Sequence, residues 1–198
     1  MFKPLKLAVV VACFAFSLDT ASAQGTGVEC QAPEGVCQRV TAYLTANVRP
    51  WASDPAIVTA VTAQSAANAK LTAADIDKLD AAWTSKSDKN LIESKMSNNL
   101  STFLKTKEAA GGGIIRDILI FDDKGLNVGQ TDMTQDYNQS DEPKYSKTFS
   151  VGPDAVFIDK VVKNAGKDIL QANMSIKDPK TNKAIGAMTV GIDVDALK

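Results

Sequence analysis

The 198-residue sequence contains no histidine. That absence excludes haem sites with a histidine ligand, zinc sites that use histidine, and every catalytic triad or dyad built on imidazole. Strong charge of either sign is missing too, because acidic and basic residues nearly balance at a formal net charge of −1. The chain therefore has no electrostatic footprint for nucleic acid or for an anionic membrane surface.

Long apolar runs are scarce, and the clearest one lies at the start of the chain. Lys3 and Lys6 precede a mostly apolar stretch over residues 7–18, and Ala21-Ser22-Ala23 has the small-x-small pattern of a cleavage site. We therefore expect residues 1–23 to be a secretory signal peptide, and the mature protein to be periplasmic or secreted without direct insertion in the membrane. The alternative is an uncleaved anchor, for which the run is short.

Cysteine is rare, with three in the sequence, and Cys13 falls within the expected signal peptide. Cys30 and Cys37 are left as an even pair in an oxidising compartment, where a disulfide is the default. The alternative is a redox switch, but nothing around the pair indicates a tuned thiolate.

Residues 24–198 are expected to form a single domain, whose first part, 24–110, is helical. Apolar residues recur at helical spacing, and proline or capping residues mark where the helices begin and end. Gly111-Gly112-Gly113 ends this part. The expected helices span about 33–48, 55–70, a segment from the Thr72–Asp75 capping box past Trp83, and a longer one from Asp88 to about Glu108.

Residues 111–198 are expected to hold the sheet and a ligand loop. Apolar and polar residues alternate over 168–177 and 184–194, and turn residues stand at 122–125 and 178–182. We predict an α+β fold, with the helices followed by a roughly five-stranded antiparallel sheet. The helices would cover one face and the loop at 130–149 part of the other, with a pocket between sheet and loop. The expected strands are 114–121, 126–130, 155–163, 168–177 and 184–194, with a short extended piece at 145–151.

The loop after the first hairpin gathers carboxylates and aromatic rings. Tyrosine offers a flat apolar face and a hydroxyl, and carboxylates beside aromatic rings suit an amine. The alternatives are solvated surface acids or a calcium site, although the D-x-D-x-D-G spacing of a calcium loop is absent. The candidate ligand-binding residues here are Asp136, Tyr137, Asp141, Glu142 and Tyr145.

Two further side chains are candidates outside that loop. Arg116 stands mid-strand and could fork onto a ligand carboxylate, or pair with Asp117 or an acid of the loop. Trp83 lies on the apolar face of its helix, where core packing is favoured over stacking on a ligand.

A set of motif residues follows the first expected strand and continues to the end of the chain. It consists of Asp123, Gly125, Leu126, Val128, Thr134, Asp136, Tyr137, Gln139, Asp141, Glu142 and Lys144, with 155–159 and 185–193. This set resembles the extracytoplasmic PAS-like sensor domains called Cache or PDC domains, and in particular small secreted proteins that consist of little else. Asn138 and Ser140 stand where that family has tryptophan and glycine. The resemblance implies a PAS-like sheet, a bound small molecule and, as a further option, a homodimer through the N-terminal helices.

Three classes of function follow from these observations. The first is a non-catalytic sensor module that binds an amine, an amino acid or a carboxylate and passes the signal to a membrane-bound partner. The second is a partner-docking protein without a ligand, for which the alanine-rich stretch 56–69 is a candidate surface. The third is an enzyme, which would need a carboxylate or Ser/Lys mechanism that no spacing supports. No cofactor and no catalytic or metal-ligating residue is expected.

Overall fold

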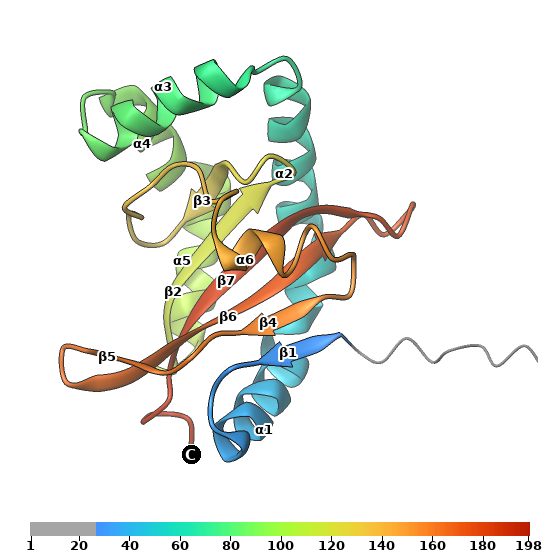
Figure 1. Cartoon of the computed structure of the whole chain (residues 1–198), viewed down its shortest axis with the longest axis vertical. Coiled ribbons are helices and arrows are strands. Elements are labelled where there is room, and N and C mark those ends of the chain that lie inside the picture. The colour runs from blue at the N-terminus through green and yellow to red at the C-terminus, as the bar shows by residue number, and fades with distance from the viewer. Residues whose placement is uncertain (1–26) are drawn as a thin grey trace, which may run out of the picture.

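The computed structural model describes residues 27–198, so the expected signal peptide lies outside the described residues. Helices and strands occur in the α+β order that the sequence predicts, with α1–α5 first and most of the sheet afterwards (Figure 1). The helical elements are α1 Glu34–Tyr43, the π-helix η1 Leu44–Val48, the 3-10 helix η2 Arg49–Ser53, α2 Pro55–Asn68, α3 Ala73–Thr84, α4 Lys89–Met96, α5 Asn99–Ala110 and α6 Pro143–Ser146. The strands are β1 Val28–Cys30, β2 Ile115–Asp122, β3 Asn127–Gln130, β4 Val156–Ile158, β5 Val162–Asn164, β6 Lys167–Lys177 and β7 Ala184–Asp193.

The described residues form one seven-stranded sheet in the order β1-β4-β6-β7-β2-β3, with β5 also paired to β6. The predicted strands are present, but the expected 155–163 strand is two short ones. The prediction missed β1 altogether, and β1 runs parallel to β4, whereas all other pairings in the described part are antiparallel. β1 has only three residues and forms against a strand more than a hundred residues away, so local sequence carries no signal for it.

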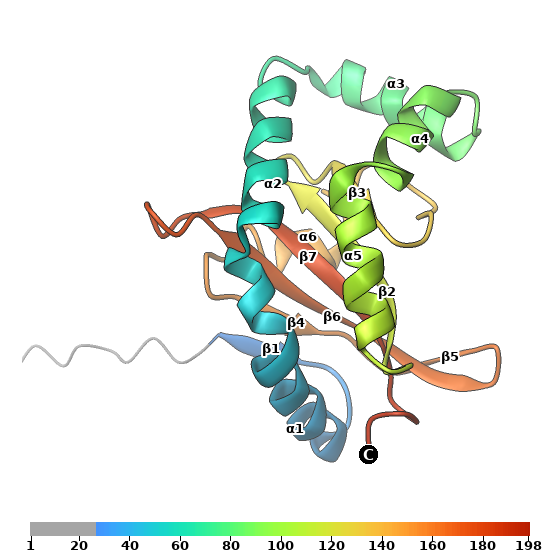
Figure 2. The ribbon, with the colours of Figure 1, turned by 180° about the vertical axis from the view of Figure 1, so that it is seen from behind.

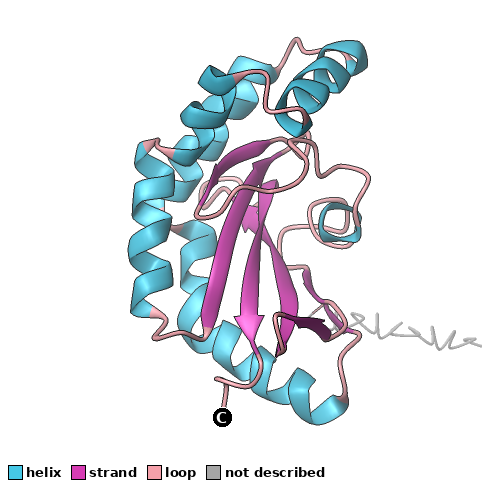
Figure 3. Ribbon diagram, turned by 90° about the vertical axis from the view of Figure 1, so that its left-hand side faces the viewer, coloured by secondary structure: helices cyan, strands magenta, loops and turns pink. Residues whose placement is uncertain are grey.

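Alternation along the central strands sends apolar side chains to one face, where α1, α2 and α5 cover them (Figures 2 and 3). Ile118 and Ile120 of β2, with Val190 and Ile192 of β7, are at most 1% exposed there. The other face is covered in part by the loop that carries α6 (Figure 3). Helices therefore cover one face of the sheet and the loop covers part of the other, as predicted. The core further holds Val40, Leu44, Ile57, Val61, Leu100, Leu104, Leu170, Ala172, Met174 and Ile176.

The expected long helix over 88–108 is broken in two at Ser97 and Asn98. Asn98 caps α5, since its side-chain oxygen accepts from the Ser101 N–H at 2.8 Å. Its amide nitrogen donates to the Val128 carbonyl at 2.8 Å, on edge strand β3. The break lets the Asn98 side chain hydrogen-bond to a backbone carbonyl of edge strand β3, while α5 packs on the sheet. No helix of the described part is both long enough and apolar enough to cross a bilayer.

Residues 145–151 are helix and turn rather than the expected extended piece. Pro143 occupies the first turn of α6, where its missing N–H costs nothing. Tyr145 and Phe149 pack over Leu119 and Phe121 on the open sheet face. This apolar cluster fixes one end of the loop to the sheet.

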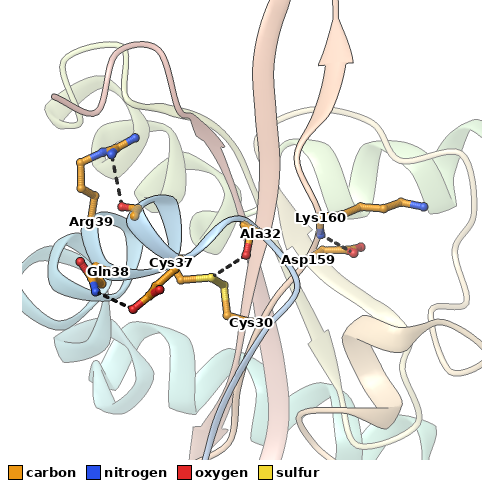
Figure 4. The surroundings of a disulfide bond; sticks show 9 residues. Cys30, Ala32, Cys37, Gln38, Arg39, Asp159 and Lys160 are labelled. Atoms are coloured by element: carbon orange, nitrogen blue, oxygen red, sulfur yellow. Dashed lines mark hydrogen bonds between the residues drawn. A yellow bond between two sulfur atoms is a disulfide. The ribbon is translucent and has the colours of Figure 1, made fainter.

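Cys30 and Cys37 are joined in a disulfide, as predicted (Figure 4). The bond ties the end of β1 to the first turn of α1. The Cys37 Sγ also lies 3.1 Å from the carbonyl oxygen of Ala32. The bridge therefore holds the short edge strand and the first helix in one unit.

Candidate functional site

A cavity of about 510 Å³ lies between the open face of the sheet and the loop before α6. This is the place that the sequence predicts for a pocket. Its floor is a row across three strands, because Asp117 of β2 pairs with Gly191 of β7, which pairs with Gln171 of β6. A Cβ at position 191 would lie 2.3 Å from Asp117 Oδ2. Glycine there is what lets the carboxylate lie flat on the sheet.

The walls come mainly from the loop over residues 132–144, with Asn164 from the end of β5. The lining is strongly polar, and four of its side chains are carboxylates while one is an ammonium group. Such a lining attracts cations. The lining residues are Asp117, Ile118, Leu119, Asp132, Met133, Thr134, Gln135, Asp136, Gln139, Glu142, Lys144, Asn164 and Gln171.

Two of the carboxylates are held in surroundings that oppose their ionised form. Burial, followed by the charges of Asp132 and Glu108, raises the pKa of Asp117 above its usual value. The pKa of Asp136 is raised by desolvation and then by the neighbouring charges of Asp80, Glu142 and Asp141. A cation that enters the cavity would relieve this repulsion between like charges.

The ammonium group belongs to Lys144, which is only 8% exposed. Its Nζ donates to Gln139 Oε1 at 3.1 Å and lies 3.1 Å from Glu142 Oε2. The positive charge is therefore already paired within the wall. The cavity keeps an excess of negative charge on Asp117, Asp132 and Asp136.

The cavity wall at 134–139 is fastened from behind by helix α3. Trp83 Nε1 donates to the Thr134 carbonyl at 2.9 Å. Asp80 Oδ1 accepts the backbone N–H groups of Tyr137 and Asn138 at 2.8 and 2.9 Å. These bonds lie on both sides of Asp136, so one helix fixes both ends of the segment that presents that carboxylate.

The same segment is also held by the β2–β3 turn. The Asn127 N–H donates to the Tyr137 carbonyl at 3.0 Å, and the Gln139 N–H donates to the Gly125 carbonyl at 2.8 Å. Gly125 has φ of +79°, and a Cβ there would lie 2.7 Å from Ser140 N. Both its backbone angle and the close approach of the loop require glycine.

A buried polar network lies behind the wall and centres on Asp122. One carboxylate oxygen accepts the N–H groups of Lys124 and Leu126, each at 3.0 Å, which is the turn role that the sequence suggests. The other accepts amide N–H groups of Gln64 and Asn68 of α2, each at 2.9 Å. The turn is thereby joined to α2.

Of the seven predicted ligand-binding residues, the cavity brings together Asp136 and Glu142. Trp83 and Tyr137 instead lie behind the wall at 0% and 2% exposure, with ring centroids 5.6 Å apart. Burial raises the pKa of the Tyr137 hydroxyl well above its usual value. Both rings support the wall, and neither lines the cavity.

The other three predicted residues also lie outside the cavity. Tyr145 packs against Phe121 and Phe149, and its hydroxyl donates to the Asp123 carbonyl at 2.8 Å. Asp141 is exposed on the outside of the loop. Arg116 is exposed and lines a separate open cleft, because the register of β2 shifts between Ile115 and Asp117. Ligand binding by these three stays a prediction that the cavity does not support.

Sequence reasoning missed Asp117, Gln171, Lys144 and Asp80. Asp117 had a usable signal, since it is a polar residue inside an apolar strand, and Gln171 stands on the polar side of an alternating strand. Lys144 belongs to the motif run of the loop. Asp80 has no local signal, because its role comes from a loop more than fifty residues later.

No group of three or more Cys, Asp or Glu side chains in the described residues is arranged to hold a metal ion. A calcium site in the loop stays a prediction.

No protein-family model matches the chain, and a search of curated proteins finds no significant match. Among solved structures, the chain is similar to the sensor domain of the histidine kinase DctB from V. cholerae, with a TM-score of 0.38 and 12% identity over 82% of this chain. It is also similar to an extracellular ligand-binding receptor from Desulfohalobium retbaense, with a TM-score of 0.35 and 13% identity over 71% of this chain.

The chain spans 55% of the first matched structure and 25% of the second. The first is named as a sensor domain and the second as a ligand-binding receptor. At these TM-scores neither likeness carries an argument, so the case for function rests on the site.

Proposed function

We propose that the chain is a non-catalytic, extracytoplasmic sensor module that binds a small amine in the acidic cavity. The observation that carries the proposal is the charge of the lining. It holds four carboxylates and one ammonium group, and that ammonium group, on Lys144, is already paired with Glu142. A ligand amine would be held by Asp117, Asp132 and Asp136 as charge-assisted hydrogen bonds. Because several carboxylates share the cavity, a diamine should bind more tightly than a monoamine of the same length.

The same proposal includes a route for the signal. The wall at 134–139 contacts the cavity on one side and is hydrogen-bonded to Asp80 and Trp83 of α3 on the other. A ligand that shifts or stiffens this wall would change the position or mobility of α3. A membrane-bound partner in contact with α3 could then respond to the ligand in the cavity. The expected readout is slower amide hydrogen exchange in 73–84 when the amine is bound.

A thermal-shift experiment with putrescine, n-butylamine and butyrate tests the ligand class. A ligand present at 100 times its dissociation constant raises the free energy of unfolding by about 2.7 kcal/mol. For a domain of this size, that raises Tm by roughly 5–11 °C. We expect putrescine to give the largest shift and n-butylamine a smaller one. Butyrate should not bind in this cavity, so any shift that it causes should be the same in the Asp136→Asn variant.

Two variants locate the binding. Asp136→Asn removes a carboxylate of the cavity, and Asp141→Asn is the matched control, since it removes an exposed carboxylate of the same loop that does not line it. The putrescine shift should shrink in the first variant and persist in the second. Equal shifts in both variants, or none in the wild type, would overturn the proposal.

One feature of the structure supports the alternative that the chain is a partner-docking protein. The outer side of α2, with Val58, Thr62 and Ala63, lines an open cleft of about 520 Å³ beside the 178–180 turn. The candidate surface at 56–69 thus stays a prediction, because the described residues do not show what would cover it.

A further inference from the structure

Two adjoining clefts lie on the helix-covered side of the sheet and share no residue with the acidic cavity. The first has a volume of about 270 Å³ and lies between residues 41–49 and strands β1, β4 and β6. The second, of about 240 Å³, lies beside it at the C-terminal end of β6. Arg49, Val156 and Met174 line both clefts.

The first cleft is mostly apolar. Val28, Leu44, Val156 and Met174 supply aliphatic or thioether surface. The hydroxyl of Thr45, also in the lining, is already used, because it donates to the Thr41 carbonyl at 2.8 Å. Such a lining suits a hydrocarbon chain rather than a polar body.

Arg49 sets the charge where the two clefts meet. No carboxylate of residues 27–198 forms an ion pair with it, and its one hydrogen bond is a long one, 3.4 Å from Nη2 to the Asp154 carbonyl. Lys177, the other cation of the second cleft, is paired with Asp154 at 3.0 Å. The guanidinium is thus the unneutralised charge of this lining, and its fork of donors matches a carboxylate.

A further observation points to a ligand at this place. Leu44–Val48 is a π-helix, a rare form that is often found at functional sites. It supplies Leu44 and Thr45 to the lining and ends next to Arg49.

We propose that these clefts form a second binding site, for a short aliphatic carboxylate. The carboxylate would be held by the guanidinium of Arg49, and the hydrocarbon chain would occupy the apolar cleft. Its 270 Å³ is just below the ~300 Å³ lower end of typical ligand pockets, which fits a small molecule. The site is independent of the amine cavity, so either proposal can fail alone.

Calorimetric titration with acetate, butyrate and hexanoate tests the proposal. Each methylene that enters the cleft should tighten binding about fourfold until the cleft is full. Hexanol, which has the same chain without the negative charge, should bind at least ten times more weakly than hexanoate. Binding that is independent of chain length, equal binding of hexanol, or no binding of hexanoate would overturn the proposal.

Variants then place the carboxylate. Arg49→Gln should weaken hexanoate binding at least tenfold, while Arg116→Gln, which removes an exposed arginine elsewhere, should leave it unchanged. Should Arg49→Gln fail to fold, Thr41→Met fills the apolar cleft with the guanidinium intact, and it should reduce hexanoate binding to the level of acetate. Retained binding in the folded variants would overturn the assignment, as would its loss in Arg116→Gln.

Discussion

Removing the Asp80 side chain tests how the cavity wall is held. Its Oδ1 accepts two backbone N–H groups at 2.8 and 2.9 Å, and a hydrogen bond to a charged group contributes about 1.5–3 kcal/mol. Asp80 is partly exposed, so solvent weakens both bonds. We expect Asp80→Ala to lower the free energy of unfolding by about 2 kcal/mol, which is about 4–8 °C in Tm.

The Asp80→Asn variant separates the effect of the two hydrogen bonds that Asp80 accepts from the effect of its negative charge. The amide oxygen still accepts hydrogen bonds, so the loss should be about 1 kcal/mol, or half that of the alanine variant. Removing the charge also takes away one cause of the raised pKa of Asp136. Amine binding in Asp80→Asn should therefore persist to a lower pH than in the wild type, because Asp136 stays ionised for longer on acidification.

The assay is thermal and urea unfolding, with putrescine titrations across pH 4–8. Asp77→Ala, an exposed acid on the same helix, is the matched control and should change Tm by less than about 2 °C. The reasoning is refuted if Asp80→Ala is as stable as the control, or if the alanine and asparagine variants lose equal stability. An unchanged pH profile in Asp80→Asn would refute the electrostatic part alone.

Three further predictions concern the cavity floor, the acid–base behaviour and the disulfide. Gly191→Ala should keep the fold but weaken putrescine binding in calorimetry, because its Cβ displaces the Asp117 carboxylate; unchanged affinity would contradict the floor geometry. Wild-type amine affinity should fall as pH drops through the raised pKa values of Asp117 and Asp136, so the decline starts above the pH of about 4 where an ordinary aspartate titrates. A decline only below that value would show that neither carboxylate binds the amine. Replacing Cys30 and Cys37 together by serine should cost about 2.5 kcal/mol in urea unfolding on the chain-entropy model, and a loss below about 0.5 kcal/mol would show that the bridge does not restrain the chain.

Local patterns in the sequence predict much of the fold. Alternation along 168–177 and 184–194 places Leu170, Ala172, Val190 and Ile192 on the face that the helices cover, and the structure confirms it. The capping box at Thr72 opens α3 as expected. These signals succeed because period and capping are properties of neighbouring residues.

The features that the sequence does not predict depend on contacts between residues far apart in the chain. Val28–Cys30 becomes a strand only because it meets β4, and the helix break at Asn98 serves the edge of β3. For the site, the location between sheet and loop was predictable, but the direction of each loop side chain was not. Tyr137 was expected in the cavity and lies behind its wall, because the stretch from Thr134 to Asn138 is hydrogen-bonded to α3.

The central claim is that the acidic cavity binds an amine through its carboxylates. Calorimetric titration of putrescine into the wild type and into an Asp117→Asn/Asp136→Asn double variant tests it most directly. We predict saturable binding to the wild type and binding at least a hundredfold weaker to the folded double variant, a difference of about 2.8 kcal/mol. Equal affinity in the two proteins, or no binding to the wild type, would contradict the claim.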